Sequence, residues 1–92
     1  SSELDQNARR LSVVQPRLTS TLRRQTPATV VVIFIVDENG RVQDPKVQRT
    51  TNPSFDRSAL TAIKQWKFEP AKVQGRSVSS RLRQSFSFEN NT

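Results

Sequence analysis

The feature that most constrains the fold is a run of strand-forming residues, TVVVIFIV, at positions 29–36. It consists mainly of β-branched residues with one phenylalanine, a composition typical of a β-strand. Both faces of this strand are apolar, with Val30, Val32, Phe34 and Val36 on one and Val31, Ile33 and Ile35 on the other. A strand of this kind belongs in the middle of a sheet with both faces covered. The run is far shorter than the ~18 apolar residues that a transmembrane helix needs.

A hairpin is expected directly after this run. Asn39 and Gly40 both tolerate a positive φ, and they stand between two strand-like segments. The returning strand covers residues 41–50, where Val42 and Val47 have opposite parity, so a bulge near Asp44 and Pro45 would bring them to one face. Because Pro45 has no backbone N–H to donate, this strand is predicted to lie at a sheet edge.

A helix is predicted to begin near residue 52. Asn52 is a capping residue with Pro53 at the first helical position, and Ser54 is the competing cap. An apolar stripe follows at helical spacing, with Leu60 at its margin: Phe55, Ala59, Ala62, Ile63 and Trp66. The stripe ends at residue 66 or 67, and Pro70 prevents continuation. Trp66 and Phe68 are interpreted as core residues rather than stacking platforms.

The last strand is predicted over residues 78–88, after a connector at residues 71–76 that contains Gly75. One of its faces is mostly apolar and the other is polar and basic. A helix between the second and third strands favours a right-handed crossover, which makes these two strands parallel to each other. The first strand then lies between them. The predicted fold is α+β: a small two-layer sandwich with a three-stranded antiparallel sheet of order 2-1-3, a β-β-α-β core and one or two short N-terminal helices.

The segment before this core reads as a polar lead-in over residues 1–27. Leu4, Ala8 and Leu11 have the spacing of one helix face, and a second short helix is expected over residues 17–24. The chain of 92 residues is long enough for one domain, predicted over residues 28–88, and residues 89–92 are a tail.

The last strand of the order 2-1-3 is left with an unpaired edge that contains no proline. Such an edge is a template for a further strand, so residues 80–87 are predicted to bind a partner by β-strand addition. Two alternatives stay open. In the first, Arg81, Arg83 and the serines of this strand form a solvated face that blunts the edge; in the second, the edge pairs with a second copy in a homodimer or domain swap.

Composition argues against several other classes of function. The chain has no cysteine and no histidine, which removes disulfides, thiolate chemistry, the commonest metal ligand and the commonest general base. We therefore expect no enzyme, no catalytic residue, no metal and no cofactor. The net charge of +7 would suit nucleic acid, an anionic surface or an acidic protein. Nucleic-acid binding is the runner-up but is not expected, because no known motif is present and the basic residues are spread out. A cell-wall binder that attaches to peptidoglycan is a further alternative.

Several blocks in order resemble the C-terminal domain of TonB-type energy transducers. They are the stretch VIFIVDENGRV at residues 32–42, NPSFD at 52–56, Ala59-Leu60, WKFEPA at 66–71, GRSV at 75–78 and the final Phe86-Ser87-Phe88. The block with a tryptophan, an aromatic residue two positions later and a proline two positions after that is the most specific. Gln15-Pro16 is also similar to a Gln-Pro found in some members, whereas Leu18-Thr19 stands where members often have Tyr-Pro.

The resemblance implies a periplasmic docking domain of a Gram-negative bacterium, anchored to the inner membrane through an N-terminal segment absent from this chain. It implies that the domain grips the TonB box of an outer-membrane β-barrel transporter and is energised by a proton-driven inner-membrane motor complex, for uptake of siderophores or vitamins. The residues that would bind the partner are Ser80, Arg81, Leu82, Arg83, Gln84, Ser85, Phe86, Ser87, Gln15 and Pro16.

Overall fold

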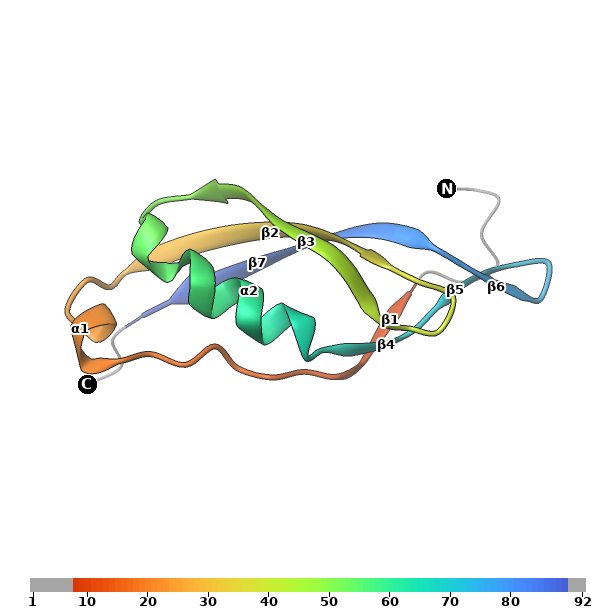
Figure 1. The fold of residues 1–92 in the computed structure, drawn as a ribbon, viewed down its shortest axis with the longest axis horizontal. Helices are drawn as coiled ribbons and strands as arrows, with labels where there is room; N and C mark the ends of the chain where they lie inside the picture. The colour runs from red at the N-terminus through yellow and green to blue at the C-terminus, as the bar shows by residue number, and fades with distance from the viewer. Residues whose placement is uncertain (1–7, 90–92) are drawn as a thin grey trace.

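A three-stranded antiparallel sheet organises the computed structural model, which describes residues 8–89 (Figure 1). The central strand is β2 (Ala28–Val36), with β3 (Val42–Thr50) on one side and β7 (Ser80–Phe88) on the other. The predicted α+β class and the sheet order 2-1-3 are confirmed. The molecule is elongated, with principal extents of 48 × 21 × 21 Å.

The inner face of the sheet forms the core together with one helix. In β2 the even-numbered residues are buried, with Val30, Val32 and Val36 at 0% exposure. The odd-numbered residues are only half-buried. Within residues 8–89, no helix or strand covers this second face, so the expectation that both faces of the central strand are covered was wrong there.

The β2–β3 hairpin confirms the predicted turn and bulge. Gly40 has a φ of +80°, and the Asp37 carboxylate accepts hydrogen bonds from the backbone N–H groups of Asn39 and Arg41, both at 2.9 Å. Asp44 has a φ of +48°, and the register shifts by one residue in β3 beside Ile33 and Ile35. β3 is an edge strand, as expected from its proline.

The helical segment begins with a 3-10 turn over Pro53–Phe55 and continues as α2 (Asp56–Lys64). Asn52 is the cap, since its side chain accepts from the Ser54 N–H at 3.0 Å. All members of the predicted stripe are buried: Phe55, Ala59, Ala62, Ile63 and Trp66. Trp66 also lies edge-on to Phe86 with ring centroids 5.6 Å apart, and Phe68 is 5% exposed, so both aromatic residues belong to the core as predicted.

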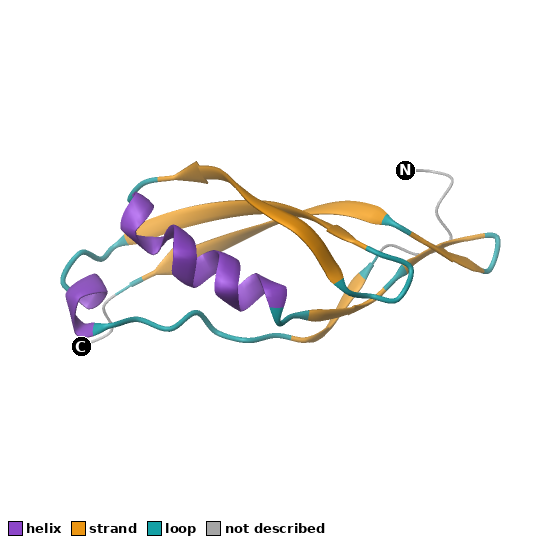
Figure 2. Ribbon diagram, in the orientation of Figure 1, coloured by secondary structure: helices purple, strands orange, loops and turns teal. Residues whose placement is uncertain are grey.

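Two short strand pairs were not anticipated from the sequence (Figure 2). β1 (Arg9–Ser12) pairs with β4 (Lys67–Glu69), and the expected connector contains a hairpin of β5 (Ala71–Val73) and β6 (Arg76–Val78). The last strand begins at Ser80 rather than at residue 78.

The N-terminal helices were predicted only in part. The prediction of a helix with Leu11 on its apolar face was wrong for the described residues, because residues 9–12 form a strand that pairs with β4. Residues 1–7 of that predicted helix lie outside the described part of the chain. The second helix is present but shorter, as α1 (Ser20–Arg23), capped by Thr19. No helix among residues 8–89 is long and apolar enough to cross a membrane.

Candidate functional site: the outer edge of β7

β7 is the sheet's second edge strand. It pairs with β2 along its whole length, from Ala28 opposite Phe88 to Val36 opposite Ser80. Within the described part of the chain, no strand is paired with its other side. The predicted long unpaired edge is therefore present in the fold.

Hydrogen bonds at the ends of β2 identify which backbone groups of β7 point outward. The Thr29 carbonyl accepts from the Thr51 N–H at 3.0 Å, and the Asp37 N–H donates to the Arg41 carbonyl at 2.9 Å. Odd-numbered residues along β2 thus direct their backbone groups toward β3. Since these directions alternate along a strand, the even-numbered residues of β2 face β7.

The register between β2 and β7 then shows in which direction each backbone N–H and C=O group of β7 points. The even-numbered residues of β2 lie opposite even-numbered residues of β7, so the N–H and C=O groups of the latter point into the sheet. The outward-pointing backbone groups are those of Arg81, Arg83, Ser85 and Ser87. Any incoming strand would pair with these groups.

One outward group already has a partner on the same strand. The side-chain amide of Gln84 donates to the Ser85 carbonyl oxygen at 2.9 Å. Ser85 accepts this bond with its outward-facing carbonyl, in agreement with the alternation above. The Gln84 side chain therefore caps one acceptor of the edge, and no strand within residues 8–89 pairs with the other outward groups.

The N-terminal segment runs beside this edge and makes it a groove rather than a bare rim. Two depressions separate the segment from β7, of about 220 Å³ and about 500 Å³. The smaller one brings together residues of both elements: Arg10, Val13, Gln15, Pro16, Trp66, Gln84, Ser85, Phe86 and Ser87. The larger one is lined by Ala8, Arg9, Arg10, Phe34, Phe68, Leu82, Arg83 and Gln84.

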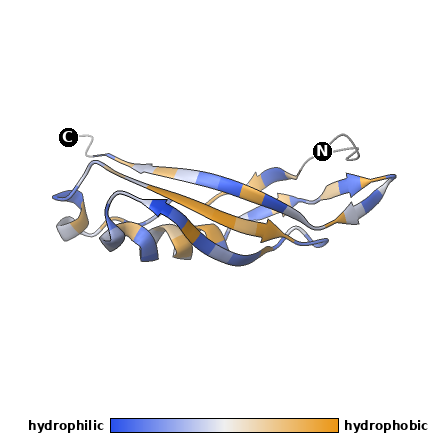
Figure 3. Ribbon diagram, turned by 90° about the horizontal axis from the view of Figure 1, so that it is seen from above, coloured by the Kyte–Doolittle hydropathy of each residue, from blue (hydrophilic) through white to orange (hydrophobic). Residues whose placement is uncertain are grey.

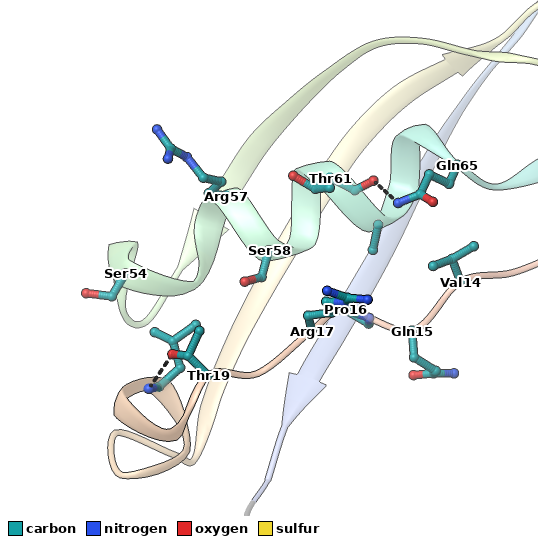
Figure 4. A pocket seen from close by; sticks show the side chains of 12 residues that line it. Val14, Gln15, Pro16, Arg17, Thr19, Ser54, Arg57, Ser58, Thr61 and Gln65 are labelled. Atoms are coloured by element: carbon teal, nitrogen blue, oxygen red, sulfur yellow. Dashed lines mark hydrogen bonds between the residues drawn. The ribbon is translucent and has the colours of Figure 1, made fainter.

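The N-terminal segment is held in place through Trp66. The indole N–H of Trp66 donates to the Val14 carbonyl oxygen at 2.9 Å, and the Val14 and Leu18 side chains pack against the core. A third depression, of about 660 Å³, lies between this segment and α2. Figure 4 shows residues 14–19 running alongside the helix, with Ser58 directed toward them and Arg57 directed away.

The structure brings together most of the residues proposed from the sequence to bind a partner. Gln15 and Pro16 share the smaller depression with Gln84 and the three residues that follow it, and Leu82 and Arg83 line the larger one. Ser80 and Arg81 lie apart from both. Among residues 8–89, the buried Ser80 hydroxyl has no hydrogen-bond partner. Arg81 lines a depression on the outer face of the sheet.

Sequence reasoning missed the contribution of Arg10 and Val13 to this groove. Val13 is 47% exposed and Leu11 is 66% exposed, so an apolar segment lies open next to the edge. The signal available in the sequence was the pair of apolar residues Leu11 and Val13 directly after the basic pair Arg9-Arg10. From the sequence alone, the spacing of Leu4, Ala8 and Leu11 indicates a helix face, and the pairing with β4 is not visible.

The surroundings of the edge are basic. Arg9 forms a salt bridge of 2.7 Å with Glu69, whereas Arg10, Arg81 and Arg83 form none within residues 8–89. The same residues contain no cluster of groups that could hold a metal ion. The groove is suited to an extended chain with acidic or polar side chains.

These features define a small α+β domain with a three-stranded sheet, one long unpaired edge and a flanking N-terminal segment. Residues 19–89 match the family described as Gram-negative bacterial TonB protein C-terminal. The chain belongs to this family.

Individual relatives agree with this assignment. The chain is 32% identical over 70 residues to proteins named TonB from Xanthomonas campestris pv. campestris, in strain B100 and in strain ATCC 33913. The match covers 75% of this chain but only 31% of each relative. The fold is also similar to the solution structure of the Pseudomonas aeruginosa TonB C-terminal domain, with a TM-score of 0.78, 24% identity and coverage of 96% of this chain and 91% of that one.

Proposed function

We propose that this domain docks outer-membrane transporters by adding a strand of the partner to the outer edge of β7, and that it catalyses no reaction. The observation that carries the proposal is the unpaired edge itself: four residues of β7 direct their backbone groups away from β2. Backbone pairing would supply the affinity, and side chains in the groove would supply selectivity.

The length of the open edge supports this mode of binding. From Arg81 to Ser87 the strand offers an N–H and a C=O at every second residue, which is enough for a guest strand of about six residues. The exposed Val13 of the N-terminal segment lines the smaller depression beside this edge, where it offers apolar contact to a side chain of the guest.

Membership of the TonB C-terminal family supports a role for this interaction in an energy-transducing assembly. We propose that the domain works in the periplasm and that an N-terminal part of the full protein anchors it to the inner membrane. The guest would be the TonB box of a transporter, and a proton-driven motor complex would supply the energy for uptake. The chain spans about a third of its curated relatives, so these roles belong to the whole protein.

Amide hydrogen exchange with a synthetic TonB-box peptide tests the proposal residue by residue. Without peptide, the N–H groups of Arg83, Ser85 and Ser87 should exchange fast, while those of Leu82 and Gln84 are protected by β2. Peptide should slow exchange at the three outward groups and leave the two inward groups unchanged. Protection that appears elsewhere and spares the outward groups would refute strand addition.

A proline substitution gives an independent test. Arg83→Pro removes an outward N–H and places its ring in the path of the guest without breaking a bond to β2. It should lower peptide affinity at least tenfold. Arg83→Ala is the matched control, since it removes the same charge and keeps the N–H. Equal affinities for the two variants would contradict backbone pairing at this residue.

A further inference from the structure

The outer face of the sheet carries an apolar stripe that the docking edge does not use. Val31, Ile33 and Ile35 lie on the face of β2 opposite α2, and each is half-buried. They are absent from the side chains that pack against the core. In Figure 3 this central strand is mostly orange between two strands with blue segments.

Rows of cations flank the stripe on both sides. Residues paired across a ladder share a face, so the registers place Arg49 beside Val31 and Lys46 beside Ile33 on the β3 side. On the β7 side the register places Arg83 beside Ile33 and Arg81 beside Ile35. Within residues 8–89, none of these four cations forms a salt bridge.

The outer face is hollowed beside Ile33 and Ile35. A depression of about 320 Å³ is lined by Ile33, Phe34, Ile35, Asp44, Lys46 and Arg81. Asp44, in the β-bulge, is the one carboxylate lining that depression. The surface therefore combines an apolar centre with an excess of positive charge on both flanks.

We propose that this outer face binds an acidic amphipathic helix of a partner protein. The helix would lie along β2, with its apolar side chains on Val31, Ile33 and Ile35. Its acidic residues on one flank would meet Lys46 and Arg49, and those on the other would meet Arg81 and Arg83. A helix in that position adds the missing second layer over a strand that is apolar on both faces.

The dimensions of the face fit a helix. The two cation rows are two strand spacings apart, about 9.5 Å, which is close to the ~10 Å diameter of a helix with its side chains. From Val31 to Ile35 the stripe extends about 13 Å, the length of roughly two and a half helical turns. The apolar spacing of such a helix, at i, i+4 and i+7, would place one side chain on each residue of the stripe.

The positive charge of this face and the partial burial of its apolar side chains argue against a second copy of the chain and against a membrane surface as the binding partner. A second copy of this chain would bring its own cation rows against these, and like charges at close range repel. A membrane surface requires protruding apolar side chains for insertion, whereas the three β-branched side chains here are half-buried between longer neighbours. An acidic amphipathic helix complements both the apolar stripe and the positive charge on its flanks.

Binding of a designed helical peptide tests the proposal. The peptide has about four turns, leucines along one face and glutamates on either side of them. NMR titration should shift the signals of Val31, Ile33 and Ile35 while leaving the outward N–H groups of β7 accessible to exchange. A twin peptide with lysines in place of the glutamates should bind at least tenfold more weakly, and the difference should shrink at high salt.

Three variants make the test specific to this face. Lys46→Glu combined with Arg49→Glu should lower affinity at least tenfold without affecting the β7 edge. Lys72→Glu combined with Arg76→Glu, on the β5–β6 hairpin, makes the same change in net charge and should have little effect. Ile33→Thr keeps a β-branched side chain and should weaken binding about fivefold by loss of apolar contact.

Several outcomes would overturn the proposal. Equal binding to both double variants would show attraction by net charge alone. Failure of the peptide to bind, together with Ile33-dependent binding to phosphatidylglycerol vesicles, would show a lipid surface instead. A dimer that dissociates when Ile33 is replaced would show that a second copy covers the face. Failure of TonB-box peptides to bind β7 would leave this result untouched, because the two surfaces share no backbone group.

Discussion

Gly40 and Phe68 approach each other so closely that the turn cannot accept a side chain. The Phe68 N–H donates to the Gly40 carbonyl at 2.9 Å, and a Cβ added to Gly40 would overlap the Phe68 carbonyl oxygen. The contact fixes the β2–β3 turn to the segment that leaves α2. Two motifs far apart in the sequence, Asn-Gly and Trp-x-Phe, are thus parts of one junction.

Gly40→Ala should therefore destabilise the domain strongly. The φ of +80° costs a non-glycine residue about 1 kcal/mol, and the overlap with Phe68 adds about 1–3 kcal/mol. Urea denaturation measures the change. Gly75→Ala is the matched control, because Gly75 has a φ of +78° and, within residues 8–89, no contact closer than 4 Å is made by the added carbon beyond its chain neighbours. If both variants lose the same free energy of unfolding, the close contact between Gly40 and Phe68 contributes nothing to stability.

The sequence predicted those elements whose patterns are long or chemically distinctive. β2 has a continuous apolar run, and α2 has a stripe bounded by Asn52 and Pro70. The bulge at Asp44 could be inferred because Val42 and Val47 must share a face, and both pack against the core.

The elements that were missed depend on contacts distant in sequence. β1 and β4 are three or four residues long, and neither has a pattern of its own. They become strands because the chain after α2 returns beside residues 9–12. The groove beside β7 follows from this same pairing, so its N-terminal wall could not be placed from periodicity.

Trp66→Phe should loosen the N-terminal wall of the groove. The variant loses the hydrogen bond to the Val14 carbonyl, worth about 1 kcal/mol, so local opening of the segment should rise about fivefold. Limited trypsin digestion should show faster cleavage after Arg17 and unchanged cleavage after Arg76. Phe86→Leu removes packing next to the same indole without removing the bond. Faster cleavage after Arg17 in both variants would assign the effect to packing alone.

Asp37 should make the stability of the hairpin depend on pH in the acidic range. Hydrogen bonds from the Arg41 backbone N–H and then from the Gln43 side chain hold the pKa of Asp37 below its ordinary value of 3.8. A carboxylate with a lowered pKa in the folded state contributes stability above that ordinary value, and the contribution is lost as the pH falls through the folded pKa.

Unfolding of Asp37→Asn across the acidic range checks this dependence. The variant should be less stable than the wild type near neutral pH, and the difference should narrow below about pH 4. Glu38→Gln removes a charge from the same turn and leaves these hydrogen bonds in place, so its difference from the wild type should change less with pH. If the difference in unfolding free energy between Asp37→Asn and the wild type stayed constant across this pH range, the role of the ionised carboxylate would be contradicted.

Gln84→Met should strengthen docking at β7 if strand addition is the binding mode. In the free domain the Gln84 amide occupies the outward Ser85 carbonyl, and a guest strand must displace it to make its own bond. Methionine keeps the length of the side chain and removes the donor. Because a hydrogen bond of this kind contributes about 0.5–1.5 kcal/mol, the affinity for a TonB-box peptide should rise by about two- to tenfold.

Calorimetric titration of three proteins separates this explanation from its alternatives. Gln65→Met removes a similar amide bond, to the Thr61 carbonyl on α2, and should bind the peptide as the wild type does. Weaker binding by Gln84→Met would mean that the Gln84 amide contacts the guest directly. Tighter binding by Gln84→Met alone would show that the edge of β7 is held partly closed by its own side chain, so that each docking event begins with the release of one intramolecular bond.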